Sequence, residues 1–289
     1  MITDPYFLYH EALRYEAEED VYNAVKLYKQ AARFAPNWSE PHQRLGRLYG
    51  RRAEWKPCLH YSQRAVELDP NGATDSWQDL ALAATALKRW RTARLAWNKL
   101  GYSFRLEDRA LNLDMGLVAL QLRHPNGNLE IVWARAVDPA RAVLDSVPHP
   151  GGEFRHGDLV LHDREPCGYR TVRGGTVVVY EAREILRRGH RQTFAALLLT
   201  ANRRHLETLD RLCLDAEVGF DNWSGAIRQM TSRERAGLPE YFGRETLPAP
   251  TEHFLVGMSA DHRSELVALL TSWRLITLCE YQLSERPLL

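Results

Sequence analysis

The sequence has few cysteines, and those it has lie far apart. Only four occur among 289 residues and none forms a CxxC pair, so neither a zinc site nor the disulfide framework of a secreted protein is expected. No apolar run approaches the ~18 residues that would cross a bilayer, and the segment after Met1 is acidic and aromatic. We therefore expect a cytoplasmic protein without a membrane span or a signal peptide.

Signatures of the common enzyme classes are also missing. No GxGxxG, P-loop, HExxH, GxSxG or kinase motif occurs. Cys167, with His162 five residues before it, is the nearest approach to a nucleophile, but neither a positioned base nor an oxyanion hole can be assigned. His156, Asp158, His162 and Asp163 lie close together, in a pattern more typical of a surface cluster at a strand end than of metal ligands. We expect no catalysis, no cofactor and no metal.

Basic charge shows no excess along the chain. The net charge is +1, with 15 basic and 12 acidic residues up to Phe104, 12 and 12 up to His190, and 11 and 13 beyond. Nucleic-acid binding domains normally carry a basic excess, so no nucleic-acid partner is expected. Lysine stops at Lys99, which fits the codon bias of a GC-rich bacterial genome.

A 34-residue period fills the N-terminal third. Pro36 recurs as Pro70 without a gap, and the other matched pairs are Tyr15 and Tyr49, Ala31 and Ala65, and Asn37 and Asn71. With one inserted residue a third unit follows, through Trp77, Leu80, Ala81, Ala84, Trp90, Ala93, Trp97 and Leu100. We expect each unit to be an antiparallel helix pair, in which the small residues Ala12, Gly46 and Ala81 allow close approach, and each proline ends a second helix.

This pattern resembles the tetratricopeptide repeat (TPR) family over about residues 5–101. The resemblance implies three stacked helix pairs whose first helices line a groove for a partner protein or peptide. The groove residues that it implies are Tyr6, Tyr9, Leu13, Glu16, Gln43, Arg47, Gly50, Arg51, Asp75, Gln78, Leu82 and Thr85. The subfamily that grips a terminal carboxylate has Lys, Asn and Arg where this chain has Tyr9, Leu13, Arg44, Asp75 and Asp79, so that clamp is not expected. A groove filled by the chain itself stays an alternative.

Residues 105–190 are expected to form a small bent sheet or partial barrel. The alternating segments are 115–123, 129–137, 158–163, 168–173 and 176–182, and Asn126-Gly127 and Gly174-Gly175 are typical hairpin turns. Asp138-Pro139 is typical of a helix start, so we expect a short helix over 138–147. A second helix is expected over 181–188, with Gly189 just past its end.

Residues 191–289 show the order β-α-β-β-α-β. Strands are expected at 193–201, 220–230, 253–260 and 275–283, with helices from Asn202 and from Asp261. This order resembles the ferredoxin-like arrangement, in which two helices cover one face of a four-stranded sheet. A loop that carries Tyr241 and Phe242 is a candidate contact site, because exposed aromatic side chains on loops often mark interfaces.

The sequence thus predicts three domains, at 1–104, 105–190 and 191–289, and a non-enzymatic protein-binding module. Adaptors, assembly chaperones and toxin-neutralising immunity proteins belong to that class. Two alternatives stay open, namely an enzyme with a site in the C-terminal half and a regulator that senses a small ligand near Gly257. The oligomeric state is not predicted.

Overall fold

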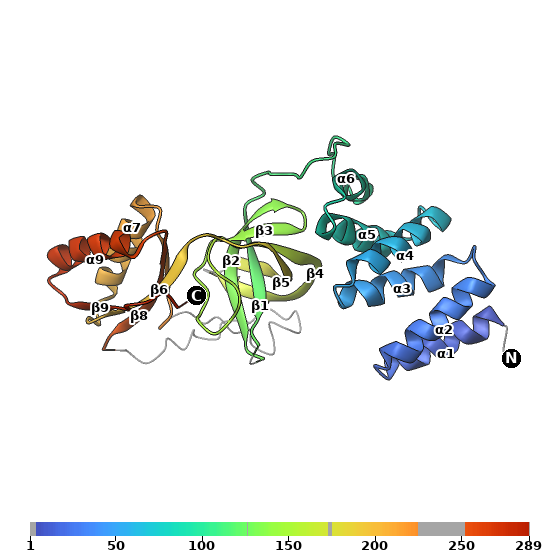
Figure 1. Cartoon of the computed structure of the whole chain (residues 1–289), viewed down its shortest axis with the longest axis horizontal. Coiled ribbons are helices and arrows are strands. Elements are labelled where there is room, and N and C mark those ends of the chain that lie inside the picture. Colours follow the sequence, from blue (N-terminus) through green and yellow to red (C-terminus); the bar gives the residue numbers. More distant parts are fainter. Residues whose placement is uncertain (1–3, 126, 173–174, 225–251, 289) are drawn as a thin grey trace. The chain divides into compact units, whose positions relative to one another are not determined.

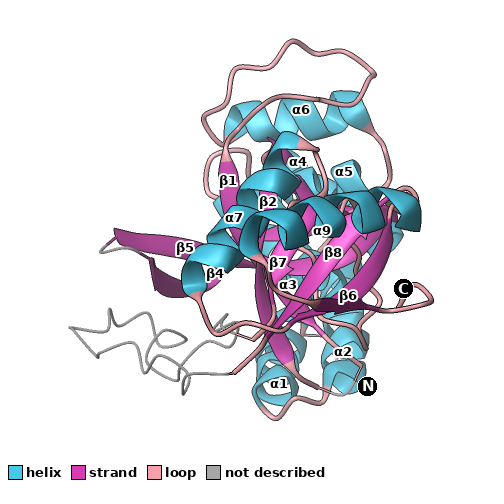
Figure 2. Ribbon diagram, turned by 90° about the vertical axis from the view of Figure 1, so that its left-hand side faces the viewer, coloured by secondary structure: helices cyan, strands magenta, loops and turns pink. Residues whose placement is uncertain are grey.

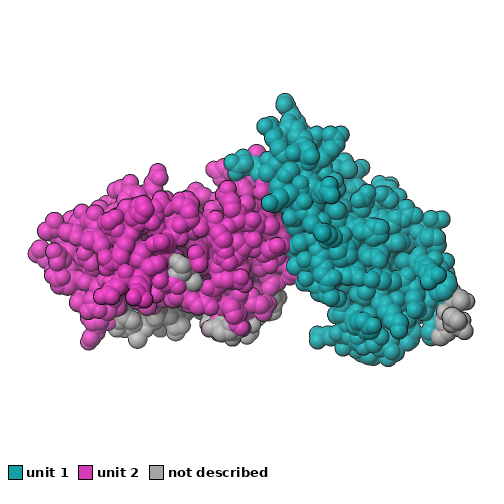
Figure 3. All heavy atoms as spheres, viewed as in Figure 1, with its two compact units in different colours: residues 1–112 teal, residues 113–289 magenta. Residues whose placement is uncertain are grey.

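The computed structural model describes residues 4–125, 127–172, 175–224 and 252–288. Within them the chain forms two compact units, residues 1–112 and residues 113–289 (Figure 3). The three-domain division stays a prediction, and the predicted contact residues Tyr241 and Phe242 lie outside the described residues. No helix in the described part of the chain has the length and apolar character needed to span a membrane.

The first unit contains six helices in three antiparallel pairs (Figure 1). The helices are α1 (Pro5–Ala17), α2 (Val21–Phe34), α3 (Ser39–Arg51), α4 (Trp55–Leu68), α5 (Thr74–Ala86) and α6 (Trp90–Lys99). First helices begin at Pro5, Ser39 and Thr74, at intervals of 34 and 35 residues, and second helices begin at the same intervals. The period found in the sequence, including the inserted residue, is therefore the period of the helix pairs.

Local signals explain where these helices begin and end. Asp4 and Asp20 are N-caps whose carboxylates accept from the backbone N–H groups of Tyr6 and Asn23. The second helices α2 and α4 end two residues before Pro36 and Pro70, since a residue that precedes proline is disfavoured in the helical region.

Small residues bring the two helices of a pair together. Gly46 of α3 faces Ser62 of α4, and a Cβ added at Gly46 would overlap the Ser62 hydroxyl and lie 3.2 Å from its backbone nitrogen. Ala12 and Ala81 are fully buried at the equivalent places of the other pairs. Any larger side chain at these points would hold the helices apart.

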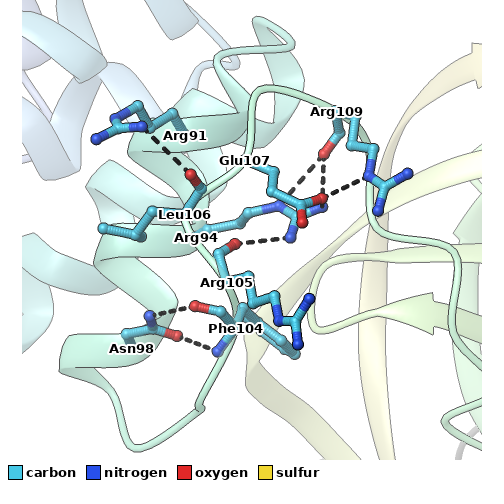
Figure 4. Close-up of polar contacts among 8 residues, drawn as sticks. All are labelled: Arg91, Arg94, Asn98, Phe104, Arg105, Leu106, Glu107 and Arg109. Carbon is cyan, nitrogen blue, oxygen red and sulfur yellow. Dashed lines mark hydrogen bonds and ion pairs between the residues drawn. The ribbon is translucent and has the colours of Figure 1, made fainter.

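The segment after α6 folds back over that helix and ends the array (Figure 4). Arg94 of α6 is 6% exposed and donates to the carbonyl oxygens of Arg105 (2.7 Å) and Arg109 (2.9 Å). Asn98 exchanges two hydrogen bonds with the backbone of Phe104, at 2.8 and 2.6 Å. The outer face of the last helix is thus covered by chain whose backbone groups are paired, as a solenoid end requires.

The second unit begins with a closed five-stranded barrel in the order β1-β2-β3-β4-β5. Its strands are β1 (Leu117–Arg123), β2 (Leu129–Asp138), β3 (Arg141–Leu144), β4 (Leu159–Val172) and β5 (Gly175–Arg187). Neighbouring strands are antiparallel, except that β1 and β5 pair in parallel and close the barrel. The expected hairpins β1–β2 and β4–β5 are confirmed, although Asn126 and Gly174 themselves are not described.

Both helices expected in this region are wrong. At 138–147 the Asp138 carboxylate accepts from the backbone N–H groups of Ala140 and Arg141, at 2.9 and 2.7 Å, and closes a tight turn into β3. The same aspartate-proline signal is typical of both a helix cap and such a turn. Residues 181–187 belong to β5, where pairing with β4 outweighs the helix propensity of Glu, Ala, Arg and Leu.

The chain ends in a four-stranded antiparallel sheet with two helices. Its elements are β6 (Gln192–Leu198), α7 (Arg203–Asp215), β7 (Gly219–Asn222), β8 (Phe254–Ala260), α9 (Arg263–Thr277) and β9 (Tyr281–Leu283), and the sheet order is β7-β8-β6-β9. Helices α7 and α9 pack side by side on one face (Figure 2). The core between helices and sheet includes Phe194, Met258, Leu209 and Trp273.

Two expectations about this sheet need correction. The strand expected at 275–283 is only Tyr281–Leu283, because α9 continues to Thr277. The strand expected at 220–230 is Gly219–Asn222, and residues beyond Ser224 are not described. Within the described residues, six N-terminal helices are followed by mixed sheets and helices, so the α+β class with a helical N-terminus is observed.

Candidate functional site

The first helices of the three pairs are linked by ion pairs. Glu16 of α1 lies 3.7 Å from Arg44 and 3.9 Å from Arg51, both on α3. Arg47 of α3 donates to Asp75 of α5 at 3.0 Å. We call the surface formed by Tyr6, Tyr9, Glu16, Trp38, Arg44, Arg47, Arg51 and Asp75 the first-helix face.

One end of the first-helix face is aromatic. Trp38, at the N-cap position of α3, has its ring centroid 4.7 Å from those of both Tyr6 and Tyr9. Tyr9 also packs on Tyr28 at 5.5 Å. Tyr6 is 62% exposed, and Tyr9 and Trp38 are partly buried, so this end offers some aromatic surface to solvent. Isolated exposed apolar residues are ordinary on monomers, but three adjoining rings form a patch of the kind found at binding sites.

The middle of the first-helix face is charged. The Tyr28 hydroxyl donates to Glu16 at 2.7 Å, and burial together with this carboxylate raises the pKa of Tyr28 above its usual value. Burial acts to lower the pKa of Arg44, but a hydrogen bond with Tyr9 and the charge of Glu16 raise it overall. Arg44 therefore stays charged beside Glu16.

The structure brings together some of the residues named from the sequence but not others. Tyr6, Arg51 and Asp75 are well exposed, whereas Tyr9, Leu13, Gln43, Arg47 and Gln78 are partly buried. Leu82, at 8% exposed, offers little surface to a ligand, and Gly50 and Thr85 are buried as well. The accessible part of the expected site is thus concentrated on α1, α3 and the start of α5.

Trp38 and Arg44 were not among the expected groove residues. Trp38 follows the Pro36-Asn37 turn, where a 34-residue alignment places Gly72, so the repeat itself carries no signal for an aromatic. The only sequence signal for an aromatic cluster here was that Tyr6 and Tyr9 are three residues apart, on one face of the expected helix. Arg44 occupies one of the positions that bind the ligand carboxylate in the clamp subfamily.

The surface cluster expected from His156, Asp158, His162 and Asp163 is wrong, because Asp158 and His162 are buried. The buried Asp158 accepts from the backbone of Arg155 and of Gly189, at 2.9 and 2.7 Å, so it holds two loops together. His162 is inside the barrel, with Nδ1 2.8 Å from the carbonyl of Asp163. No three histidine, cysteine, aspartate or glutamate residues in the described ranges are grouped as metal ligands.

Cys167, the candidate nucleophile, and Gly257, near which a ligand site was considered, both make contacts within the fold. Cys167 donates to the Val179 carbonyl at 3.3 Å, and burial followed by the charge of Glu181 raises its pKa to about 11. The thiolate that nucleophilic chemistry needs is therefore disfavoured. The ring of Trp223 lies on Gly257, where an added Cβ would overlap it, and Trp223 Nε1 donates to the Val147 carbonyl at 3.0 Å.

Two distant structural neighbours illustrate what this chain is similar to. No family model matches the chain, and no curated protein matches it. A structure of the TPR2B domain of yeast Sti1, described as a TPR2B-domain:pHsp70 complex, shows 21% identity over 33% of this chain and 75% of that one, with a TM-score of 0.30. A hypothetical protein from Neisseria gonorrhoeae shows 9% identity over 60% of this chain and 95% of that one, with a TM-score of 0.26. Because both TM-scores are so low, neither neighbour indicates a function for this chain.

Proposed function

We propose that residues 5–101 form a TPR-like array and that its first-helix face binds an extended segment of another protein. The support for the array is its geometry: helix pairs at intervals of 34 and 35 residues, with glycine or alanine where the paired helices are closest. Such pairs bury their apolar faces only by stacking, and stacking generates an extended surface lined by every first helix.

One observation carries the binding proposal, namely the adjacency of an exposed aromatic cluster and a row of arginines on the first-helix face. Tyr6, Tyr9 and Trp38 can pack on an apolar side chain, and aromatic residues and arginine are the residue types enriched at binding sites. Arg47 and Arg51 can pair with carboxylates. The segment that fits best carries an apolar side chain followed by an acidic one.

The ion pairs on this face are expected to set a moderate affinity. Glu16 and Asp75 already pair with the arginines, so an acidic ligand must displace them and gains only the difference between two similar interactions. Exposed ion pairs contribute about 0–1 kcal/mol each, which makes this exchange feasible.

The protein is then a non-enzymatic binding module of the cytoplasm, of the class that includes adaptors, assembly chaperones and toxin-neutralising immunity proteins. The C-terminal sheet would be a ferredoxin-like domain, in keeping with its element order and its sheet order β7-β8-β6-β9. Fold alone assigns no activity to that domain, so the array carries the functional proposal.

A paired charge reversal tests the binding surface. The full chain, an Arg47→Glu/Arg51→Glu variant and a Lys26→Glu/Arg33→Glu variant serve as baits in a native extract, and the captured protein is then titrated by calorimetry. Lys26 and Arg33 are exposed on the second helix α2, so the control makes the same charge change off the first-helix face. We expect at least about a tenfold loss of affinity for the first variant only, equal to about 1.4 kcal/mol. Equal affinity of all three proteins would refute the proposal.

A further inference from the structure

A thiol and an imidazole meet at the junction of α7 and β9, far from the first-helix face in sequence. Cys279 Sγ lies 3.3 Å from His205 Nδ1. Both residues are partly buried, and Cys279 packs against the core beneath the helices. The Trp273 indole donates to the His205 carbonyl at 2.8 Å, which fixes α9 against α7 at this point.

Neighbouring hydrogen bonds determine which nitrogen of His205 carries the proton. Asn202 is the N-cap of α7, and its side-chain oxygen accepts from the Arg204 N–H at 3.0 Å. The amide nitrogen of Asn202 must then face His205 Nε2, which lies 3.3 Å away and acts as acceptor. A neutral His205 therefore holds its proton on Nδ1.

That proton points toward two atoms. Nδ1 lies 2.9 Å from the Thr200 hydroxyl oxygen and 3.3 Å from Cys279 Sγ. When Cys279 loses its proton, the Nδ1–H can turn its hydrogen bond to the sulfur, because a hydrogen bond to a charged acceptor is about twice as strong as one to a neutral acceptor. The other charges near the turn are those of Arg274 and Glu280, which form an ion pair at 3.5 Å.

The backbone before Cys279 takes an unusual conformation. Leu278, which ends α9, has φ 57° and ψ 23°, in the left-handed region that glycine normally occupies. Leu278 is 89% exposed, so no burial of its own side chain offsets this conformation. The turn directs Cys279 back onto α7 and beside His205.

The other thiols serve as internal references. Cys58 and Cys213 are buried, and burial raises the pKa of each to about 12. Cys167 is partly buried like Cys279, and each thiol donates to a backbone carbonyl, that of Val179 at 3.3 Å for Cys167 and that of Thr277 at 3.5 Å for Cys279. Cys279 alone among these four has an imidazole N–H within reach of its sulfur.

We propose that Cys279 is a modification site that undergoes thiol–disulfide exchange with small disulfides, and that His205 acts as a positioning residue that stabilises the thiolate. The thiol releases its proton to solvent, and the thiolate attacks one sulfur of the disulfide. A new S–S bond forms to Cys279, the original S–S bond breaks, and the other half leaves as a thiolate. This site is independent of peptide binding by the array.

The rate on the unaltered chain is the first test. The full protein at neutral pH is mixed with an aromatic disulfide that releases a coloured thiolate, and the modified cysteines are identified by mass spectrometry after digestion. We expect one fast phase, assigned to Cys279 and absent from Cys279→Ser, with a rate constant above that of N-acetylcysteine under the same conditions. A slower reaction than this free thiol, or equal modification of Cys167, would overturn the proposal.

Two substitutions of His205 test its role. His205→Leu removes the donor and should slow the fast phase by about tenfold. His205→Asn, whose amide nitrogen can take the place of Nδ1, should stay within about threefold of the unaltered rate. Thermal unfolding checks that both variants are folded. If His205→Leu does not fold, the rate of His205→Asn and the comparison with N-acetylcysteine decide whether the proposal holds. Equal slowing of two folded variants would show that His205 is merely structural and would overturn its assignment.

Discussion

Gly46 of α3 lies against the backbone of Ser62 in α4, and this contact sets the closest approach of the second helix pair. A methyl group added there would overlap the Ser62 hydroxyl and crowd its nitrogen at 3.2 Å. Gly50, one turn further along α3, has more room, since its added Cβ would meet Cys58 Sγ at 3.3 Å and Asp79 Oδ1 at 3.6 Å.

We therefore predict that Gly46→Ala is less stable than Gly50→Ala by about 1–3 kcal/mol. Both substitutions gain similar helix propensity, so their difference isolates the crowding at Ser62. Urea unfolding followed by circular dichroism measures it. Equal midpoints for the two variants would mean that Gly46 does not fix the distance between α3 and α4.

The cap on the third helix pair gives a second prediction. Arg94→Met keeps the length of the side chain but leaves the carbonyls of Arg105 and Arg109 without their donor, and we expect a loss of about 2–4 kcal/mol. The control is Arg91→Met, because Arg91 is exposed and makes a single bond of 3.2 Å to the Leu106 carbonyl. Its loss should stay below about 1 kcal/mol.

Limited digestion with trypsin distinguishes a local from a global effect of Arg94→Met. If the segment over α6 is held by Arg94, cleavage after Arg105 and Arg109 should accelerate in this variant before the helices unfold. An unchanged cleavage rate at both sites, with unchanged stability, would contradict the capping role.

The sequence predicts the helical array well because its signals are local and repeated. The prolines two residues past the ends of α2 and α4 act over a few residues, and a small residue recurs at fixed spacing in all three units. Glu16, Arg47, Arg51 and Asp75 of the first-helix face follow from the same register. Trp38 does not, because its role depends on a ring contact with Tyr6 and Tyr9 across two helices.

The barrel was less predictable because its pairing is non-local. Residues 181–187 have helix-forming composition, and only the antiparallel partner β4, with Leu161 opposite Glu184, makes them a strand. The contact between His205 and Cys279 joins residues 74 positions apart. No spacing rule connects two such positions, so the thiol site could be found only in the folded chain.

The turn at Asp138 supports a third prediction. Asp138 and Arg141 are both buried, with Oδ2 of the aspartate 2.6 Å from the arginine Nε. Asp138→Ala leaves the arginine charge buried without this carboxylate and should cost about 3–5 kcal/mol. Removing both charges, in Asp138→Ala/Arg141→Met, should cost less than the sum of the two single changes. Urea unfolding of the unaltered chain, the two single variants and the double variant gives the coupling free energy between Asp138 and Arg141. If the two losses of stability simply add, the buried ion pair is contradicted.

The last prediction concerns acid pH and His156. This histidine packs against Gly219, and its Nδ1 has no hydrogen-bond partner among the described residues. Burial, with a smaller effect from Arg191, lowers the pKa of His156 to about 4, while Asp145 opposes the change. In the unfolded chain a histidine has a pKa of about 6.5, so the unfolded state binds the proton first as the pH falls.

The contribution of His156 to stability should therefore be complete above pH ~6.5 and be lost progressively between pH ~6.5 and ~4, by about 1–3 kcal/mol. In His156→Gln this part of the pH dependence disappears, so the stability difference between the two proteins should shift in favour of the variant as the pH falls. His60→Gln, at an exposed position of α4, is the matched control. Urea unfolding at a series of pH values measures all three proteins, and parallel profiles for the unaltered chain and His156→Gln would refute the assignment.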